Sequence, residues 1–126
     1  MNGIDFLIDT NVVIYVLEGL PAVKGIMRCS AAVSVVSEME LLGKQNISEQ
    51  EETAIRDLLN DCEILKFNDE IKNTTITIKK QFNMKLPDAI IAATAKYYGL
   101  MFITVDKDFK KLDGYINVVI LNTDKT

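Results

Sequence analysis

Five short apolar runs, separated by segments with helical character, constrain the fold of this chain more than any other feature. Several of the runs are continuously hydrophobic, as expected for strands that are covered on both faces. Strands that alternate with helices form a mainly parallel sheet with helices on both sides. The sequence therefore predicts an α/β fold, a three-layer α/β/α sandwich around a five-stranded parallel sheet, with strands at residues 4–8, 32–36, 62–67, 101–105 and 117–121.

Start and stop signals divide the remaining segments into helices. Ser48, followed by Glu51 three residues later, forms a capping-box pattern. A helix that starts at Asn68 or Asp69 contains the run TTITI, which has strand propensity. A proline near its start and a glycine at its end bound an alanine-rich helix late in the chain. The predicted helices cover residues 11–18, 21–28, 37–45, 48–60, 68–82 and 86–99.

The composition is that of an ordinary globular protein, with 126 residues, 48% of them hydrophobic and 25% charged. We find no internal repeat and no linker rich in proline and glycine, so residues 1–126 are expected to form one domain. No apolar run reaches the roughly 18 to 20 residues of a membrane span, and no signal peptide is recognisable. We therefore expect a cytoplasmic protein. Cys29 and Cys62 belong to no metal-binding pattern and are expected to be reduced thiols.

Histidine is absent, and this limits the available chemistry. Its absence removes the usual general base, every Ser-His-Asp or Cys-His arrangement, and the common imidazole ligand of zinc. An enzyme built on this chain must use carboxylates, hydroxyls, lysines or a hard metal ion. The net charge of −4 argues against a protein that coats nucleic acid, although bound divalent cations would reverse the charge locally.

Four acidic residues lie where such a metal ion could bind. Asp9 and Asp106 end two predicted strands, and open parallel sheets bind ligands outside the carboxyl ends of their strands. Asp88 lies in the first turn of its helix. Glu40 lies in a largely apolar helix, where a lone carboxylate needs a partner. Hard oxygen ligands suit Mg²⁺ or Mn²⁺ and disfavour zinc.

Each acid also has a purely structural interpretation. Asp9 could cap the first helix, Asp88 could be an ordinary first-turn acid, and Asp106 could be a turn residue. Glu40 could be a charge at the rim, beside the equally available Glu38. The metal-site hypothesis therefore depends on a fold that brings all four acids to one edge of the sheet.

Four segments, in this order, resemble the PIN-domain family, and in particular the VapC-type toxins of bacterial toxin–antitoxin pairs. FLIDTNVVIYVL is similar to the family's strand-Asp-Thr-Asn start and places its first acid on Asp9. SVVSEMELLG, with a serine where the family often has threonine, selects Glu40. LPDAIIAATAKYYGL carries the third acid onto Asp88. FITVDKDF carries the fourth onto Asp106, with Asp108 as a helper. The likeness covers almost the whole chain.

The resemblance implies a PIN-like sheet order of 3-2-1-4-5 and a metal-dependent ribonuclease that acts as the toxin of a type II toxin–antitoxin pair. The four acids would be the catalytic residues and would hold one or two Mg²⁺ or Mn²⁺ ions. Thr10, Asn11 and Thr104 are expected to orient these ligands or water. The expected partners are an RNA substrate, an antitoxin protein and a second copy of the chain in a homodimer, without a membrane.

Basic and apolar side chains are less specific signals. Five lysines could contact the RNA backbone or could simply be solvated: Lys44, Lys79, Lys80, Lys85 and Lys107. Apolar residues of the early helices could form a dimer face, bind an antitoxin, or belong to the core: Val12, Val13, Tyr15, Val16, Leu17 and Leu20.

Three alternatives compete with a nuclease. A receiver-like signalling domain needs a lysine after the last strand, where Asn122 stands. A haloacid-dehalogenase-like phosphatase needs an Asp two residues after the first one, where Asn11 stands. The third alternative is a PIN scaffold that binds RNA or protein without catalysis, and the presence of all four acids argues against it.

Overall fold

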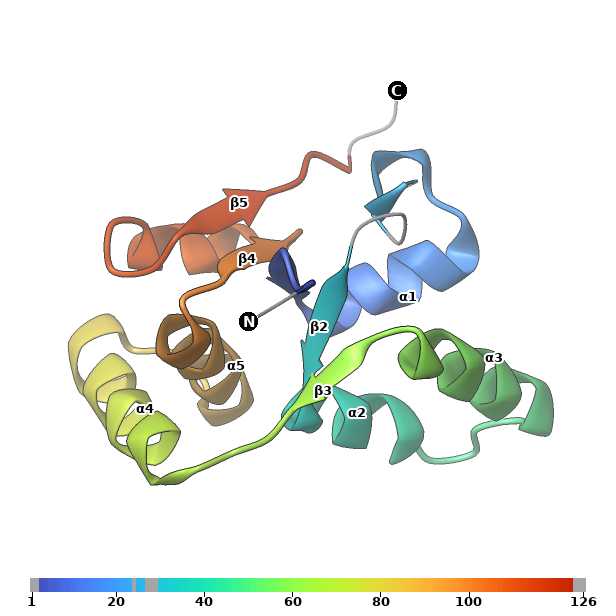
Figure 1. Cartoon of the computed structure of the whole chain (residues 1–126), viewed down its shortest axis with the longest axis horizontal. Coiled ribbons are helices and arrows are strands. Elements are labelled where there is room, and N and C mark those ends of the chain that lie inside the picture. Colours follow the sequence, from blue (N-terminus) through green and yellow to red (C-terminus); the bar gives the residue numbers. More distant parts are fainter. Residues whose placement is uncertain (1–2, 24, 27–29, 124–126) are drawn as a thin grey trace.

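Five parallel strands form one sheet in the computed structural model, which describes residues 3–23, 25–26 and 30–123 (Figure 1). The strand order is β3-β2-β1-β4-β5, so the predicted fold and the order implied by the resemblance are confirmed. In central β1, Leu7 pairs with Ala32 of β2 and Phe102 of β4. Receiver-like domains have the order 2-1-3-4-5, and that alternative is therefore wrong. The strands are β1 Phe6–Ile8, β2 Ala31–Ser34, β3 Glu63–Leu65, β4 Met101–Thr104 and β5 Val118–Ile120.

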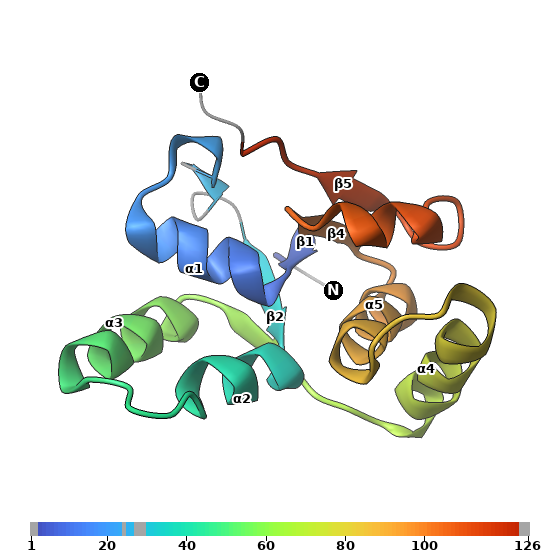
Figure 2. The ribbon, with the colours of Figure 1, turned by 180° about the vertical axis from the view of Figure 1, so that it is seen from behind.

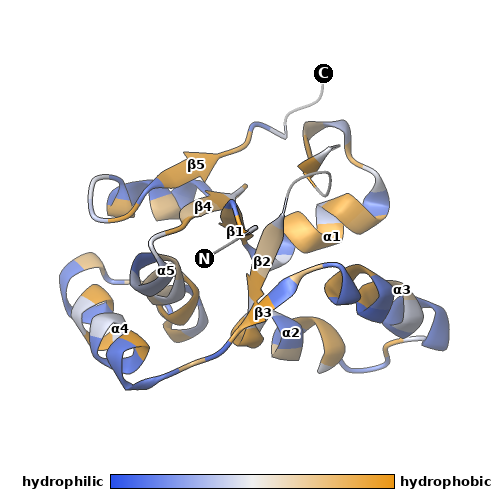
Figure 3. Cartoon of the chain, in the orientation of Figure 1, coloured by the Kyte–Doolittle hydropathy of each residue, from blue (hydrophilic) through white to orange (hydrophobic). Residues whose placement is uncertain are grey.

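Helices cover both faces of this sheet and give three layers (Figures 1 and 2). Successive side chains of a strand point to opposite faces. Leu7 belongs to the core shared with α4 and α5, whereas Phe6 and Ile8 belong to the core shared with α1 and α3. Figure 3 shows the apolar strands between helices whose surfaces are mixed. The helices are α1 Thr10–Glu18, α2 Val35–Leu42, α3 Glu49–Asn60, α4 Asp69–Phe82 and α5 Leu86–Tyr98, with the 3-10 helices η1 Pro21–Val23 and η3 Lys107–Leu112.

Local sequence signals set the starts of α3 and α4. Ser48 Oγ accepts the N–H of Glu51 (3.0 Å), and the Glu51 carboxylate accepts the N–H of Ser48 (3.3 Å), which confirms the capping box. Asn68 caps α4 by accepting the N–H of Ile71 (2.8 Å). This helix forms despite its β-branched run because Ile71 and Ile78 are buried on one face. None of the helices in the described ranges is both long and apolar enough to span a membrane.

The structure corrects several predicted boundaries. The run 32–36 is not one strand, because β2 ends at Ser34, whose hydroxyl accepts the N–H of Val36 (3.0 Å) and caps α2. The helix predicted to reach residue 45 ends at Leu42, before Gly43. The helix predicted at 21–28 is not continuous: η1 covers Pro21–Val23, and Gly25 takes a φ of 94° that an α-helix does not accommodate. Residues 24, 27 and 28 of that prediction lie outside the described residues, and η3 was not predicted.

Cys62 is a half-buried free thiol, as predicted. Its pKa is raised to about 11, mainly by burial and also by the charge of Asp61. Because the thiolate is the reactive form of cysteine, this side chain is unreactive at neutral pH. Cys29 lies outside the described residues.

Candidate active site

Asp9 follows central strand β1 directly and is buried, with 4% of its surface exposed. Its N–H donates to the carbonyl of Ile103 (3.0 Å), which ties it to β4. Asp9 Oδ1 accepts the N–H of Thr10 (2.8 Å), and Oδ2 accepts the hydroxyl of Thr104 (2.8 Å). Asp9 is also the N-cap of α1, so the capping interpretation is confirmed. A capping role alone does not explain why the Asp9 carboxylate is buried and accepts a hydrogen bond from Thr104 of β4.

The pKa of Asp9 is raised from 3.8 to about 6. Burial is the largest cause, the hydrogen bonds from Thr104 and Thr10 oppose it, and the charges of Asp88 and Asp106 add to it. Like charges raise one another's pKa when they lie close together in a region of reduced solvation. These three acids, which are remote in sequence, are therefore brought to one region of the structure.

Asp88 lies half-buried in the first turn of α5, as predicted. Burial raises its pKa, and the charges of Asp106 and Glu40 raise it further, whereas Lys85 lowers it. The pKa of Asp88 is thus raised by acidic residues from two other segments of the chain. These effects indicate that Asp88 lies near Asp106 and Glu40, whereas the role of the four acids as one metal site stays a prediction.

Asp106 lies two residues beyond the end of β4 and is half-buried. Its N–H donates to Thr104 Oγ1 (3.0 Å), and its Oδ1 accepts the N–H of Asp108 (2.9 Å), so that it caps η3. Asp108 is exposed, and its carboxylate lies 3.5 Å from the ammonium group of Lys111. The local turn therefore fixes Asp106, whereas Asp108 is directed toward a surface ion pair.

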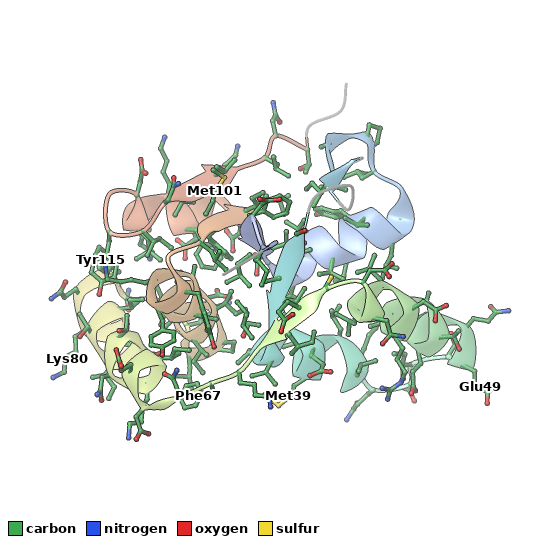
Figure 4. All side chains as sticks on the ribbon, in the orientation of Figure 1. Met39, Glu49, Phe67, Lys80, Met101 and Tyr115 are labelled. Atoms are coloured by element: carbon green, nitrogen blue, oxygen red, sulfur yellow. The ribbon has the colours of Figure 1, made fainter. Side chains whose placement is uncertain are left out.

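Glu40 occupies a different environment from the predicted one. It was expected in an apolar face, but it is exposed; its neighbour Met39 is 60% exposed and projects from α2 (Figure 4). The physical reason is that α2 buries Ser37 and Leu41 and turns the opposite side to solvent. Glu40 Oε1 accepts the hydroxyl of Thr10 (2.7 Å), so a hydroxyl meets the need for a partner.

Thr10 and Thr104 link three of the four acids into one hydrogen-bonded chain through hydroxyl and backbone N–H groups. Thr10 gives its N–H to Asp9 and its O–H to Glu40. Thr104 gives its O–H to Asp9 and accepts the N–H of Asp106. Thr10 and Thr104 thus lie where the sequence predicted groups that orient the acids.

Two other polar residues differ from the prediction. Asn11 is exposed, and its side chain has no hydrogen bond to the described residues, so its orienting role stays a prediction. Ser37, which the sequence did not single out as a site residue, is fully buried and contacts the Thr10 hydroxyl (2.7 Å). Its position three residues before Glu40, one helical turn away, is the signal that could have found it.

The donor chemistry of this site fits a hard divalent cation. All four predicted acids offer carboxylate oxygens, and none of them is in a salt bridge within the described ranges. Mg²⁺ and Mn²⁺ prefer such ligands. Over the same ranges, no three or more acidic or cysteine side chains are placed so that together they could hold a metal ion. Hydroxyl and backbone groups donate to the carboxylates of Asp9 and Glu40.

The lysines considered for RNA contact lie in different environments. Lys44 pairs with Glu51 (3.2 Å), and Lys79 donates to the carbonyl of Met84 (3.1 Å). Lys80 is exposed and points outward from α4 (Figure 4). Lys85 lies next to α5 and acts electrostatically on Asp88, whereas Lys107 lines a pocket of about 430 Å³ beside β5 with Lys110. The charge of Lys85 thus acts on one of the four acids, Asp88.

An apolar groove of about 310 Å³ adjoins the acids between α1, α2 and α3. Its lining includes Thr10 and Glu40, apolar side chains such as Ile14, Leu17 and Ile55, and the charged residues Glu18, Lys44 and Glu51. Leu17 is 37% exposed. Val12 and Val13 of α1 are fully buried and belong to the core, as one interpretation of the early helices held. Tyr15, Val16 and Leu20 are partly buried.

Fold and site together define an α/β protein with an acidic site at the carboxyl end of a central parallel strand. The PIN domain family matches residues 6–115 of the sequence. The chain belongs to the PIN domain family. It is also 39% identical over 62 residues to the curated relative Ribonuclease VapC6 of Methanocaldococcus jannaschii. That match covers 48% of this chain and spans only 40% of the relative's length.

Solved structures with the same fold extend over nearly the whole chain. A toxin-antitoxin complex from Klebsiella pneumoniae contains a chain that is 28% identical, with a TM-score of 0.77 and coverage of 91% of this chain and 96% of that one. VapBC2 from Rickettsia felis, bound to a DNA fragment from its promoter, has a TM-score of 0.81 at 17% identity, with coverage of 94% and 99%. DNA-bound VapBC from Salmonella typhimurium has a TM-score of 0.80 at 20% identity, with coverage of 93% and 98%. The last two likenesses support the fold alone.

Proposed function

We propose that this chain is a Mg²⁺- or Mn²⁺-dependent endoribonuclease that hydrolyses RNA phosphodiester bonds as the toxin of a type II toxin–antitoxin pair. The observation that carries the proposal is buried Asp9, whose pKa is raised to about 6 by burial and by neighbouring acids. A carboxylate is rarely placed in such surroundings for stability alone, and perturbed acids of this kind cluster at functional sites. The named ribonuclease relative and the Klebsiella complex support the proposal.

Asp9, Glu40, Asp88 and Asp106 are the residues that would hold one or two ions. A bound ion would lower the pKa of water and offset the charge that develops on the phosphate, which suits a chain without histidine. The protein's own contribution is orientation. Two threonine hydroxyls fix the directions of the Asp9 and Glu40 carboxylates before substrate arrives, and catalytic electrostatics depend on such preorganisation.

Cleavage of structured RNAs by the purified protein tests this proposal. We expect cleavage with Mn²⁺ or Mg²⁺, none with EDTA, and a loss of at least about a hundredfold in D9N, because metal catalysis requires its ligands. D57N, which removes an exposed acid from α3, is the matched control and should cleave normally. Metal binding without cleavage of any RNA would favour the alternative of a non-catalytic PIN scaffold that binds RNA or protein.

We also propose an antitoxin protein as partner, supported by the toxin-antitoxin complex from Klebsiella, and a homodimer as the free state. The cytoplasm is the proposed place of action. Light scattering after size exclusion should give about twice the 14.1 kDa mass of the chain. A single-chain mass at micromolar concentration would refute the homodimer and leave the nuclease proposal unaffected.

A further inference from the structure

Ser37 is a polar side chain in an apolar position. It lies in the first turn of α2 and is 0% exposed. Within the described residues its side chain has one hydrogen-bond partner, the Thr10 hydroxyl of α1, at 2.7 Å. A buried hydroxyl costs free energy unless it is hydrogen-bonded, and alanine would occupy this position without that cost. We therefore attribute the presence of a hydroxyl at position 37 to its hydrogen bond with Thr10.

The direction of this hydrogen bond follows from counting protons. Thr10 has one hydroxyl proton, and it points to Glu40 Oε1 at 2.7 Å. A carboxylate at neutral pH can only accept. At the contact between Ser37 and Thr10 the donor is therefore Ser37, and the order of donation is Ser37 to Thr10 to Glu40.

We infer that Ser37 is a positioning residue, whose hydroxyl holds the Thr10 hydroxyl in the orientation that directs Glu40 toward the other acids. Thr10 also gives its N–H to Asp9 (2.8 Å), so this one residue donates to two carboxylates from different elements. A donor that is itself a hydrogen-bond acceptor is polarised and binds more strongly. The consequence for metal binding rests on the proposed function, whereas the order of donation does not.

A double-variant cycle with Mn²⁺ affinity as the readout, measured by calorimetry, tests the inference. T10V keeps the branched shape and the N–H to Asp9 but removes the hydroxyl, and we expect a loss of about tenfold, the lower range for groups that orient metal ligands. S37A should lose roughly threefold by itself and nothing more in the T10V background, because Ser37 acts through Thr10. T10S should restore the wild-type affinity.

T75V is the matched control, since Thr75 is buried and its hydroxyl donates to the Ile71 carbonyl within α4, away from the acids. It should lower the melting temperature and leave Mn²⁺ affinity unchanged. The inference would be overturned if S37A bound Mn²⁺ with wild-type affinity. It would also be overturned if S37A lowered the affinity by the same factor in the wild-type and T10V backgrounds. If the wild-type protein binds no Mn²⁺, the proposed metal dependence fails. Crystal structures of S37A and T10V then test the positioning role of Ser37 by themselves. The inference requires that the Glu40 side chain leaves its wild-type position in both variants.

Discussion

Opposing effects meet at Asp9. Burial and the charges of Asp88 and Asp106 favour its protonated form, whereas donors from Thr104 and Thr10 favour the carboxylate. Without a cation, ionisation of this residue at neutral pH lowers the stability of the fold. A bound divalent ion would reverse that effect, because it supplies the opposite charge that no lysine or arginine supplies through a salt bridge in the described ranges.

The raised pKa of Asp9 predicts how the stability of the metal-free protein depends on pH. From 3.8, the ordinary value, to about 6, the folded state binds more protons at Asp9 than the unfolded state does. The free energy of unfolding therefore falls as pH rises through this window. D9N stays neutral, so we expect it to be more stable than wild type at pH 7.5 in EDTA, by about 1 to 3 kcal/mol.

Urea unfolding at pH 4 and pH 7.5 measures this difference, which should be small at the lower pH. D57N, on the exposed side of α3, should stay within about 0.5 kcal/mol of wild type at both values. If D9N were less stable than wild type at pH 7.5, the hydrogen bonds of the Asp9 carboxylate would outweigh the cost of burying its charge.

At the scale of elements, predictions succeeded where local signals acted alone. The capping box of α3 and the Asn68 cap of α4 are local, and both helices form where predicted. Predictions failed where one apolar run served two elements. The run 32–36 crosses from β2 into α2, because Ser34 ends the strand and caps the helix. Apolar residues suit both a covered strand and a buried helix face, so hydrophobicity could not locate that boundary.

The site shows the same division between local and tertiary information. The positions of Asp9, Asp88 and Asp106 near element ends could be predicted, since each depends on an adjacent strand or helix start. The exposure of Glu40 could not, because it depends on which side of α2 packs against its neighbours. The role of Ser37 depends on an approach between α1 and α2 that only the folded chain contains.

At the scale of the whole molecule, the site exists only when the sheet order is correct. Asp9 and Asp106 come from the neighbouring strands β1 and β4, and Glu40 and Asp88 come from helices that follow β2 and precede β4. The unfolded chain does not bring these acids together. A ligand that binds all of them therefore stabilises the native state as a whole, in proportion to its affinity.

Mn²⁺ should consequently raise the melting temperature of the EDTA-treated protein. At a concentration of about 100 times its Kd, a ligand that binds only the folded state adds about 2.7 kcal/mol, which for a domain of this size raises the melting temperature by about 10 °C. Differential scanning calorimetry at millimolar Mn²⁺ measures the shift. D9N/D106N should lose it, whereas E49Q/D57N, which removes two exposed acids of α3, should keep it. An unchanged melting temperature in wild type, or a shift that survives in D9N/D106N, would show that the four carboxylates are not a metal site.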